Sequence, residues 1–251
     1  MTAPSLIIAA HGTRDLRGLA TMAALADQVA AAAPAAVRLA FADVASPTLA
    51  DVLDAAPAAD AIVVPAFLAS GFHVRTDLPR QAAAAGPRRT LRIAGAIGPD
   101  PVLAAVQALR LREAGRAEAD AVLMAAVGSS DPRARADVRR AGRLLSDALD
   151  VPVSTALCAD GSKAIEAAVE RLRSAGARRV AVSPYLLSEG LFHSRITDCG
   201  ADVVADPIGD HPALARLIVH RMRAIAVPAA EARQCSGDRR QPFTRARRAI
   251  R

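Results

Sequence analysis

Short apolar runs alternate with longer amphipathic segments along the first half of the chain. Four runs of mostly small and branched apolar residues have the length of strands: 5–10, 37–42, 61–66 and 91–95. Continuous apolar runs of this kind are typical of strands that are buried on both faces of a parallel sheet. The segments between them predict helices at about 18–33, 48–56, 76–85 and 100–115, with Asp77 at the start of the third. This alternation predicts an α/β fold with right-handed crossovers.

The same pattern then starts again in the second half. Three blocks repeat earlier ones in the same order: 121–134 repeats 5–18, 179–198 repeats 61–77, and 206–223 repeats 95–112. Matched blocks in one order indicate a duplicated unit. We therefore expect two tandem copies of a four-stranded parallel-sheet α/β unit that face each other across a cleft. The expected limits are 1–117 and 118–227, followed by a basic tail, 228–251, that is predicted to be disordered because it lacks apolar periodicity.

Polar residues follow the predicted strands of the first copy. His11 comes directly after the first strand, Asp43 after the second, and His73 lies in the loop after the third. The carboxyl ends of parallel strands form the crevice in which ligands bind, so these side chains are expected to face one cavity. In the second copy Val127 stands at the place of His11, and His193 lies one residue beyond the place of His73. The first copy is thus expected to hold the chemistry and the second to supply a wall.

Two imidazoles and a carboxylate indicate a site for a divalent metal. His11 and His73, with Asp43 as the third ligand, would suit Fe²⁺, Co²⁺, Ni²⁺ or Zn²⁺ and would leave coordination positions open for a substrate. The alternative is that each histidine is a hydrogen-bonded or capping residue. Asp15 and Asp131, each before helical sequence, are predicted to be helix N-caps.

Charge and motifs exclude several classes of function. The net charge is +7, but residues 228–251 contain seven Arg and two acidic residues, a surplus of +5, so the body carries only +2. That balance does not favour a nucleic-acid surface. The three cysteines form no CxxC, the amino terminus lacks a basic region and a long apolar run, and no phosphate-binding GxxxxGK[ST] loop is present. We expect a cytoplasmic monomer that acts on neither nucleic acid nor membranes.

Three stretches together carry a resemblance to a known family. They are AHGTRD at the first strand end, FAD followed by SPTLADVL, and VVPAFLASGFHVRTDLP. The sequence resembles the sirohydrochlorin chelatases, the class II chelatases of the SirB and CbiX type, in their long two-unit form, over roughly residues 5–225. The resemblance implies a lyase that inserts Fe²⁺ or Co²⁺ into sirohydrochlorin in siroheme or cobalamin biosynthesis. It also implies no ATP, no cofactor beyond the substrate metal, and sirohydrochlorin and the metal as partners.

The resemblance further implies roles for individual residues. The metal ligands of the family fall on His11 and His73, and His11 is also the implied proton acceptor. The acidic residue of the family, commonly Glu, falls on Asp43, whose shorter side chain has less reach. The loop implied to contact the macrocycle is Leu68, Ala69, Ser70, Gly71, Phe72 and His73. Arginines are expected near the cavity mouth to meet the eight carboxylates of the substrate: Arg14, Arg17, Arg75 and Arg80.

Two other functions remain as alternatives. A His-Gly pair at a strand end is also found in histidine phosphatases, but those need an arginine directly before the histidine, where this chain has Ala10. A carrier of metal or tetrapyrrole without turnover would keep His11 and His73 as well. A turnover assay separates the carrier from an enzyme, whereas a binding assay does not.

Overall fold

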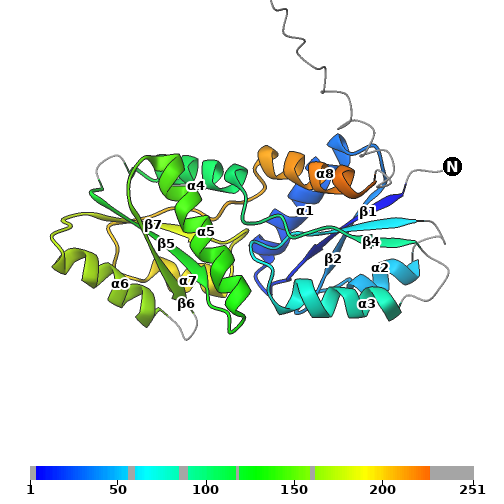
Figure 1. The fold of residues 1–251 in the computed structure, drawn as a ribbon, viewed down its shortest axis with the longest axis horizontal. Coiled ribbons are helices and arrows are strands. Elements are labelled where there is room, and N and C mark those ends of the chain that lie inside the picture. Colours follow the sequence, from blue (N-terminus) through cyan, green and yellow to red (C-terminus); the bar gives the residue numbers. More distant parts are fainter. Residues whose placement is uncertain (1–3, 56–59, 85–89, 117–118, 159–161, 227–251) are drawn as a thin grey trace, which may run out of the picture.

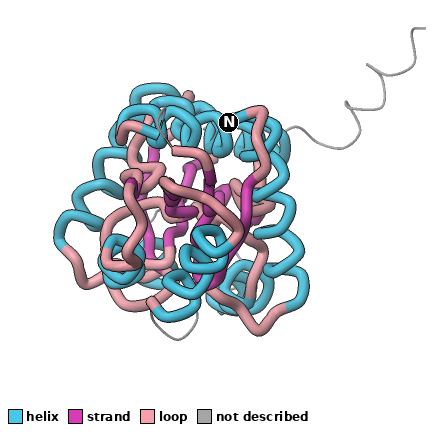
Figure 2. The backbone as a smooth tube through the Cα atoms, turned by 90° about the vertical axis from the view of Figure 1, so that its left-hand side faces the viewer, coloured by secondary structure: helices cyan, strands magenta, loops and turns pink. Residues whose placement is uncertain are grey.

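The computed structural model describes residues 4–55, 60–84, 90–116, 119–158 and 162–226, and the predicted basic tail lies outside them. Two four-stranded parallel sheets lie end to end, each with helices on both faces (Figure 1). Seen along the long axis, the strands occupy the interior and the helices surround them (Figure 2). The predicted α/β fold with two parallel-sheet units is confirmed. Within the described ranges, no helix is both long enough and apolar enough to cross a bilayer.

The first sheet has the strand order β2-β1-β3-β4. Its strands are β1 (Ser5–Ala10), β2 (Val37–Phe41), β3 (Ala61–Pro65) and β4 (Leu91–Ile93). Its connections contain α1 (Leu16–Ala32), α2 (Leu49–Ala55), the π-helix η1 (His73–Asp77) and α3 (Leu78–Ala84). The chain leaves β1 toward β2 on one side and later places β3 on the other. Ligands of open α/β sheets bind beyond the strand ends at such a reversal.

The second sheet repeats this order as β6-β5-β7-β8. Its strands are β5 (Ala121–Val127), β6 (Val153–Cys158), β7 (Val180–Tyr185) and β8 (Val203–Val204). The helices from the end of the first repeat onward are α4 (Pro101–Glu113), α5 (Pro132–Leu149), α6 (Lys163–Ser174), α7 (Leu191–Thr197) and α8 (Pro212–Ala226). The reversal of order again falls between the first and third strands, so both sheets offer the same kind of crevice.

The apolar runs arise because each central strand is buried on both faces. Along β1, Leu6 and Ile8 belong to the core shared with α1 and α8, whereas Ile7 and Ala9 pack with α2 and α3. Alternate side chains of a strand point to opposite faces, so every position of β1 has to be apolar. The helices that cover these faces begin where the sequence indicates. Asp15 and the equivalent Asp131 accept the backbone N–H two residues on, and both predicted N-caps are confirmed.

The last helix of each repeat packs on the sheet of the other repeat. Helix α4 follows β4 in sequence but packs against α5 and β7, and α8 packs against α1 and β3 (Figure 1). Arg221 of α8 also donates to Asp100, the N-cap of α4, at 2.9 Å. The sequence boundary near 116–119 lies between α4 and β5, and the domain limits 1–117 and 118–227 stay a prediction. In space, the two units exchange their final helices.

The third helix region begins earlier than predicted. The expected start at Asp77 is wrong, because Asp77 is the last residue of η1 and the chain continues directly into α3. The Arg75 N–H donates to the Gly71 carbonyl at 3.1 Å, so helical geometry begins near Gly71. The wider turn of η1 places His73 and Asp77 on one side of the helix, where the carboxylate can accept a hydrogen bond from the imidazole.

Candidate metal site between the two sheets

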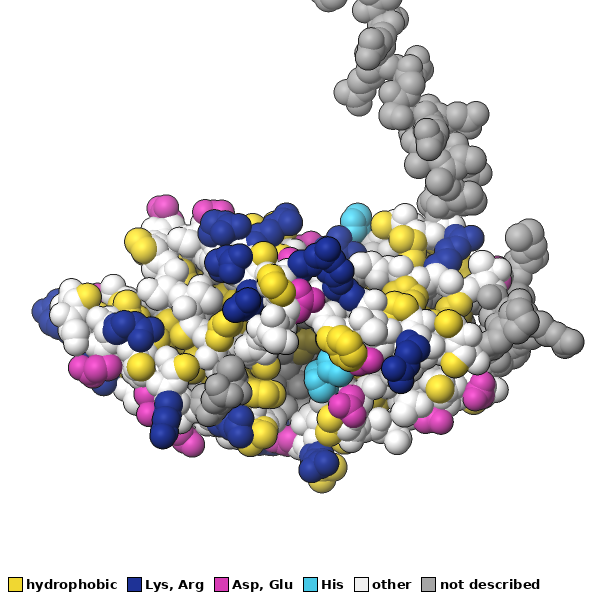
Figure 3. Space-filling model, turned by 60° about the horizontal axis from the view of Figure 1, so that its bottom comes forward, with side chains coloured by type: hydrophobic (Ala, Val, Ile, Leu, Met, Phe, Trp, Pro, Cys, Tyr) yellow, Lys and Arg dark blue, Asp and Glu magenta, His cyan; other side chains and the backbone are white. Residues whose placement is uncertain are grey.

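A cavity of about 810 Å³ opens between the two units and is lined by both. The first unit contributes the segments after β1 and β3, and the second contributes those after β5 and β7. Figure 3 shows a hollowed region near the middle of one face, bordered by apolar side chains and a histidine. The volume lies within the range of about 300–1,000 Å³ found for small-molecule sites. The predicted cleft between the crevices is confirmed.

His11 is placed by the tight turn that follows β1. Gly12 has a φ of +100°, and a Cβ at this position would lie 2.1 Å from the carbonyl oxygen of Asp43. Only glycine allows this approach, because it has no Cβ and adopts positive φ without strain. The Asp43 N–H donates to the His11 carbonyl oxygen at 3.0 Å. The ends of β1 and β2 are therefore joined directly beside the imidazole.

His73 is the first residue of η1 and is oriented by Asp77. The His73 Nδ1 lies 2.6 Å from the Asp77 Oδ2, and both side chains are partly buried. A carboxylate only accepts hydrogen bonds, so the imidazole proton is on Nδ1 and the lone pair of the neutral ring is on Nε2. A carboxylate that fixes a histidine in this way is typical of metal-binding histidines. The sequence does not predict this role, because i, i+4 spacing is a signal only within a helix and the expected helix, about 76–85, leaves out His73.

The structure brings the two imidazoles together. Their ring centroids are 4.6 Å apart at an interplanar angle of 69°, and Phe67 lies 6.2 Å from His11 and 6.1 Å from His73. Burial, and next the neighbouring His73, lower the pKa of His11, although Asp43 opposes this. The lowered pKa keeps His11 neutral at neutral pH, which is the form that binds a metal or accepts a proton. Both imidazoles are thus close enough to be expected to share one ion.

Asp43 does not join this pair. Its side chain is exposed and accepts the N–H of Val44 at 2.7 Å, and it is not among the residues that line the cavity. Within the part of the chain that the structure describes, no three His, Cys, Asp or Glu side chains form a group that could hold a metal. The predicted His-His-Asp set is therefore not assembled, because the short carboxylate turns back to its own loop. A contact between Asp43 and a bound substrate stays a prediction.

The loop after β3 forms much of the cavity wall. The predicted residues that line the cavity are Leu68, Ala69, Gly71, Phe72 and His73 from the loop, together with Arg14. Ser70 does not line it, and its N–H instead donates to Asp137 at 2.9 Å. Of the other predicted arginines, Arg17 pairs with Asp15 at 2.9 Å, whereas Arg75 and Arg80 are exposed outside the lining. Arg14 is thus the predicted arginine that the structure places at the cavity.

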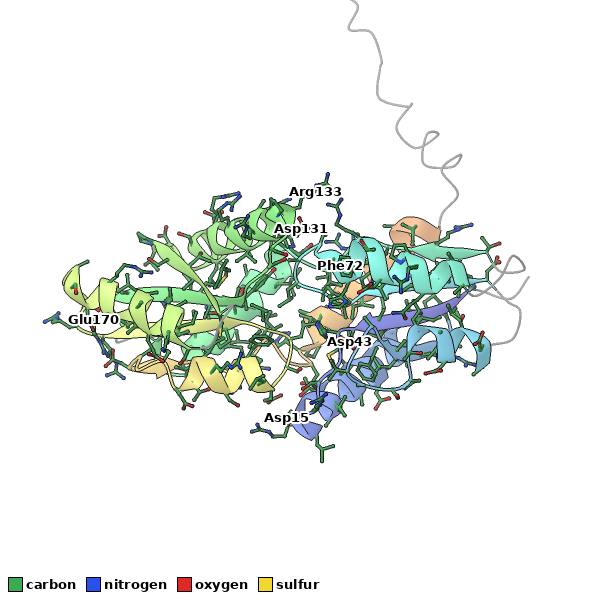
Figure 4. The ribbon with its side chains drawn as sticks, turned by 90° about the horizontal axis from the view of Figure 1, so that it is seen from below. Asp15, Asp43, Phe72, Asp131, Arg133 and Glu170 are labelled. Carbon is green, nitrogen blue, oxygen red and sulfur yellow. The ribbon has the colours of Figure 1, made fainter. Side chains whose placement is uncertain are left out.

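The described part of the second unit supplies an apolar and polar wall, to which His193 contributes one imidazole rather than a pair. Val127 ends β5 and lines the cavity, as do Glu189, Leu191 and His193. Large apolar side chains are exposed on both sides of the cavity, with Phe72 of the first unit at 60% and Leu191 of the second unit at 63%. Figure 4 shows Phe72 and Asp43 at the end of the first unit that faces the second. An apolar cavity of this form suits a large ligand with flat apolar faces, and sequence analysis did not identify Glu189 or Leu191.

The geometry agrees with the comparison to known families. The CbiX family model matches residues 5–114 and again residues 121–225. The chain belongs to the CbiX family. The two matches also coincide with the two repeats, which confirms the resemblance to sirohydrochlorin chelatases that the sequence indicates.

Curated relatives of this CbiX-family chain include two chelatases from Priestia megaterium. The sirohydrochlorin ferrochelatase is 25% identical over 202 residues, which are 74% of this chain and 76% of that protein. The sirohydrochlorin cobaltochelatase is 27% identical over 211 residues, which are 77% of this chain and 67% of that protein. The two relatives act with different metals at similar identity, so identity alone does not select a metal for this chain.

Solved structures show the same fold. The sirohydrochlorin chelatase SirB from Bacillus subtilis subspecies spizizenii, in complex with cobalt, has a TM-score of 0.74 at 22% identity. The match covers 90% of this chain and 96% of that chain. SirB from Bacillus subtilis with Fe³⁺ has a TM-score of 0.72 at 22% identity, over 92% and 98% of the two chains. Nearly the whole described fold is therefore shared with these chelatases.

Proposed function

We propose that this protein is a sirohydrochlorin chelatase, a lyase that inserts Fe²⁺ or Co²⁺ into sirohydrochlorin in siroheme or cobalamin biosynthesis. Membership of the CbiX family and two relatives with these activities support the reaction. The observation that carries the proposal is the approach of the His11 and His73 rings to 4.6 Å within a cavity formed by both units. No further cofactor is needed for the reaction proposed.

His11 and His73 would hold the incoming metal ion. Neutral imidazoles are good ligands for Fe²⁺ and Co²⁺, and two of them leave several coordination positions to water. The pyrrole nitrogens of the macrocycle can then replace these waters one at a time. The bond from His73 Nδ1 to Asp77 leaves Nε2 available to the metal and limits rotation of the ring.

His11 would also accept a proton. Insertion replaces two pyrrole N–H protons by one divalent ion, so the charge of the macrocycle core is unchanged and two protons have to leave. The pKa of His11 is lowered by burial and by the neighbouring His73, which keeps the ring unprotonated and able to act as a general base. It would take the first proton as the metal moves from the imidazoles to the pyrrole nitrogens, pass it to solvent, and then take the second proton in the same way.

The cavity walls would place the macrocycle over the two histidines. Phe67, Phe72 and Leu191 offer apolar contacts to its faces. Arg14 lies at the cavity, where its guanidinium can bind a peripheral carboxylate in a bidentate manner. The other predicted contacts are Leu68, Ala69, Ser70 and Gly71 of the loop after β3, and Asp43 after β2. The second unit, which has Val127 where the first has His11, would serve as the opposite wall.

The test is insertion by the purified protein. Sirohydrochlorin is incubated without oxygen with Fe²⁺ or Co²⁺, and the absorbance of the macrocycle is followed against the uncatalysed rate. We expect rapid conversion with one or both metals and no conversion above background for His11→Ala. The matched control is His220→Ala, because His220 is exposed on α8 away from the cavity and its loss should leave the rate unchanged. A normal rate for His11→Ala would reject the assignment.

A further inference from the structure

The loop that carries His73 is held in place by the second unit. Tyr185, the last residue of β7, is 4% exposed, and its hydroxyl donates to the Leu68 carbonyl oxygen at 2.9 Å. Burial, and next the nearby carboxylates of Asp137 and Asp100, raise the pKa of Tyr185, so the hydroxyl stays protonated and remains a donor. The contact is tightly packed, because a Cβ on Gly98 would lie 2.8 Å from this hydroxyl and 2.5 Å from the Leu68 oxygen.

Helix α5 of the second unit makes a second bond to the same loop. The Asp137 Oδ2 accepts the N–H of Ser70 at 2.9 Å. A Cβ on Gly71 would lie 3.8 Å from the Cβ of Ala134, which is ordinary van der Waals contact between the loop and α5. The backbone of the loop is thus fixed at Leu68 and at Ser70 by two different elements of the other unit.

These bonds act on the residues directly before the metal-binding turn. The Gly71 carbonyl accepts the N–H of Arg75, which begins the helical geometry that carries His73. The first unit fixes the start of the loop, where the Gly98 N–H donates to the Phe67 carbonyl at 3.0 Å. His11 is held through the Asp43 N–H of its own unit, and α1, which follows it, is bonded to the second unit where the Thr21 hydroxyl donates to Glu189 at 3.0 Å. The second unit therefore bonds directly to the backbone of the loop that carries His73, at Leu68 and Ser70.

We propose that Tyr185 and Asp137 are positioning residues that hold His73 at the correct distance from His11. This inference rests on the proposed function of His73 as a metal ligand. It gives the second repeat a specific task beyond that of a wall: it completes the metal site although the two proposed metal ligands, His11 and His73, both belong to the first repeat. The site is then sensitive to the relative placement of the two units, because the loop between Leu68 and Ser70 bridges them.

The test removes these bonds one at a time and measures Co²⁺ binding by calorimetry without the macrocycle. The variants are Tyr185→Phe, which keeps the ring and removes only the hydroxyl, and Asp137→Ala with its conservative partner Asp137→Asn. The matched control is Ser183→Ala in the same strand. Ser183 is 1% exposed and accepts a hydrogen bond from Gln107 at 2.9 Å, but it does not line the cavity. The melting temperature and the kcat and KM of insertion are measured for every variant.

We expect Tyr185→Phe and Asp137→Ala each to weaken Co²⁺ binding about tenfold, the lower end of the effects found for groups that orient metal ligands. Asp137→Asn should lose less Co²⁺ affinity than Asp137→Ala, because its amide oxygen can still accept the hydrogen bond from the Ser70 N–H. Ser183→Ala should lower the melting temperature and leave Co²⁺ affinity unchanged. Unchanged affinity in Tyr185→Phe and Asp137→Ala, or an equal loss in Ser183→Ala, overturns the proposal. Absence of insertion by the parent protein with Co²⁺ binding intact would instead reject the proposed reaction, and the binding series would still decide this inference.

Discussion

Asp77 offers the sharpest test of how the metal site is built. The bond of 2.6 Å joins two side chains that are 29% and 21% exposed, so water competes only partly with it. In Asp77→Ala the imidazole of His73 loses the acceptor that fixes its tautomer and its rotation. Loss of such a partner typically lowers metal affinity about 10- to 100-fold, which corresponds to about 1.4–2.7 kcal/mol. We expect a loss in this range for Co²⁺.

The assay is calorimetric titration with Co²⁺, followed by the insertion rate with sirohydrochlorin. Asp77→Asn keeps an oxygen that can accept from Nδ1 but removes its charge, so its affinity should lie between those of the parent and Asp77→Ala. The matched control is Asp51→Ala. Asp51 accepts the N–H and the hydroxyl of Thr48, each at 2.8 Å, and its own N–H donates to the Thr48 hydroxyl, so the two residues form a capping box at the start of α2. Its loss should lower the melting temperature without a change in Co²⁺ affinity.

An Asp77→Ala variant that binds Co²⁺ as tightly as the parent would refute the role of Asp77 in orienting His73. It would equally be refuted by Asp51→Ala with the same loss of affinity, because the effect would then follow from stability rather than from the orientation of His73. Asp77→Asn at the level of Asp77→Ala would show that the charge of the carboxylate matters more than its position as an acceptor.

Three further predictions concern stability. Gly12→Ala should lower the free energy of unfolding by more than the roughly 1–3 kcal/mol of backbone strain at positive φ, because its Cβ would also meet the Asp43 carbonyl. Gly115→Ala, with a φ of +87° and open space around it, measures the strain alone in the same urea titration. In acid, stability should fall as the pH drops below about 4, because Asp120 accepts two backbone N–H groups that lower its pKa, and the unfolded chain therefore binds more protons. Asp120→Asn should flatten the dependence of the urea midpoint on pH in this range, and an unchanged slope would contradict the account. A fragment of residues 1–113 lacks α8, which covers α1 and β3, so it should fail to form a stable monomer by circular dichroism and size-exclusion chromatography.

The strands and their parallel sheets could be predicted because burial on both faces leaves a strong pattern. Strands β1 and β3 are nearly continuous apolar runs, and the repeat blocks show that the unit occurs twice. The exchange of α4 and α8 could not be predicted. An amphipathic helix shows in its sequence that one face is apolar, but the pattern does not say which of two similar sheets that face covers.

The histidines of the site could be predicted because strand ends fix their location, whereas the carboxylates could not. Asp77 resembles an N-cap in sequence, and the wider π-turn that joins it to His73 is not visible in residue spacing. Asp43 follows a strand as expected, but the direction of its side chain depends on the loop, where Val44 has a φ of +67°. Tyr185 and Asp137 act across the interface, and no local signal connects residues that are 67 or more positions apart.

The exchange of final helices has a consequence for how such a protein can assemble. In a chain with a single unit, the surface of α1 and β3 would be exposed unless the last helix of a second copy packed on it. The fraction of covered units would then fall as the protein is diluted. With both units on one chain, the lending partner is always present at a high effective concentration. The two units can therefore differ at the metal site, where the second unit has Val127 in place of His11. Each sheet still depends on the other unit for its last helix.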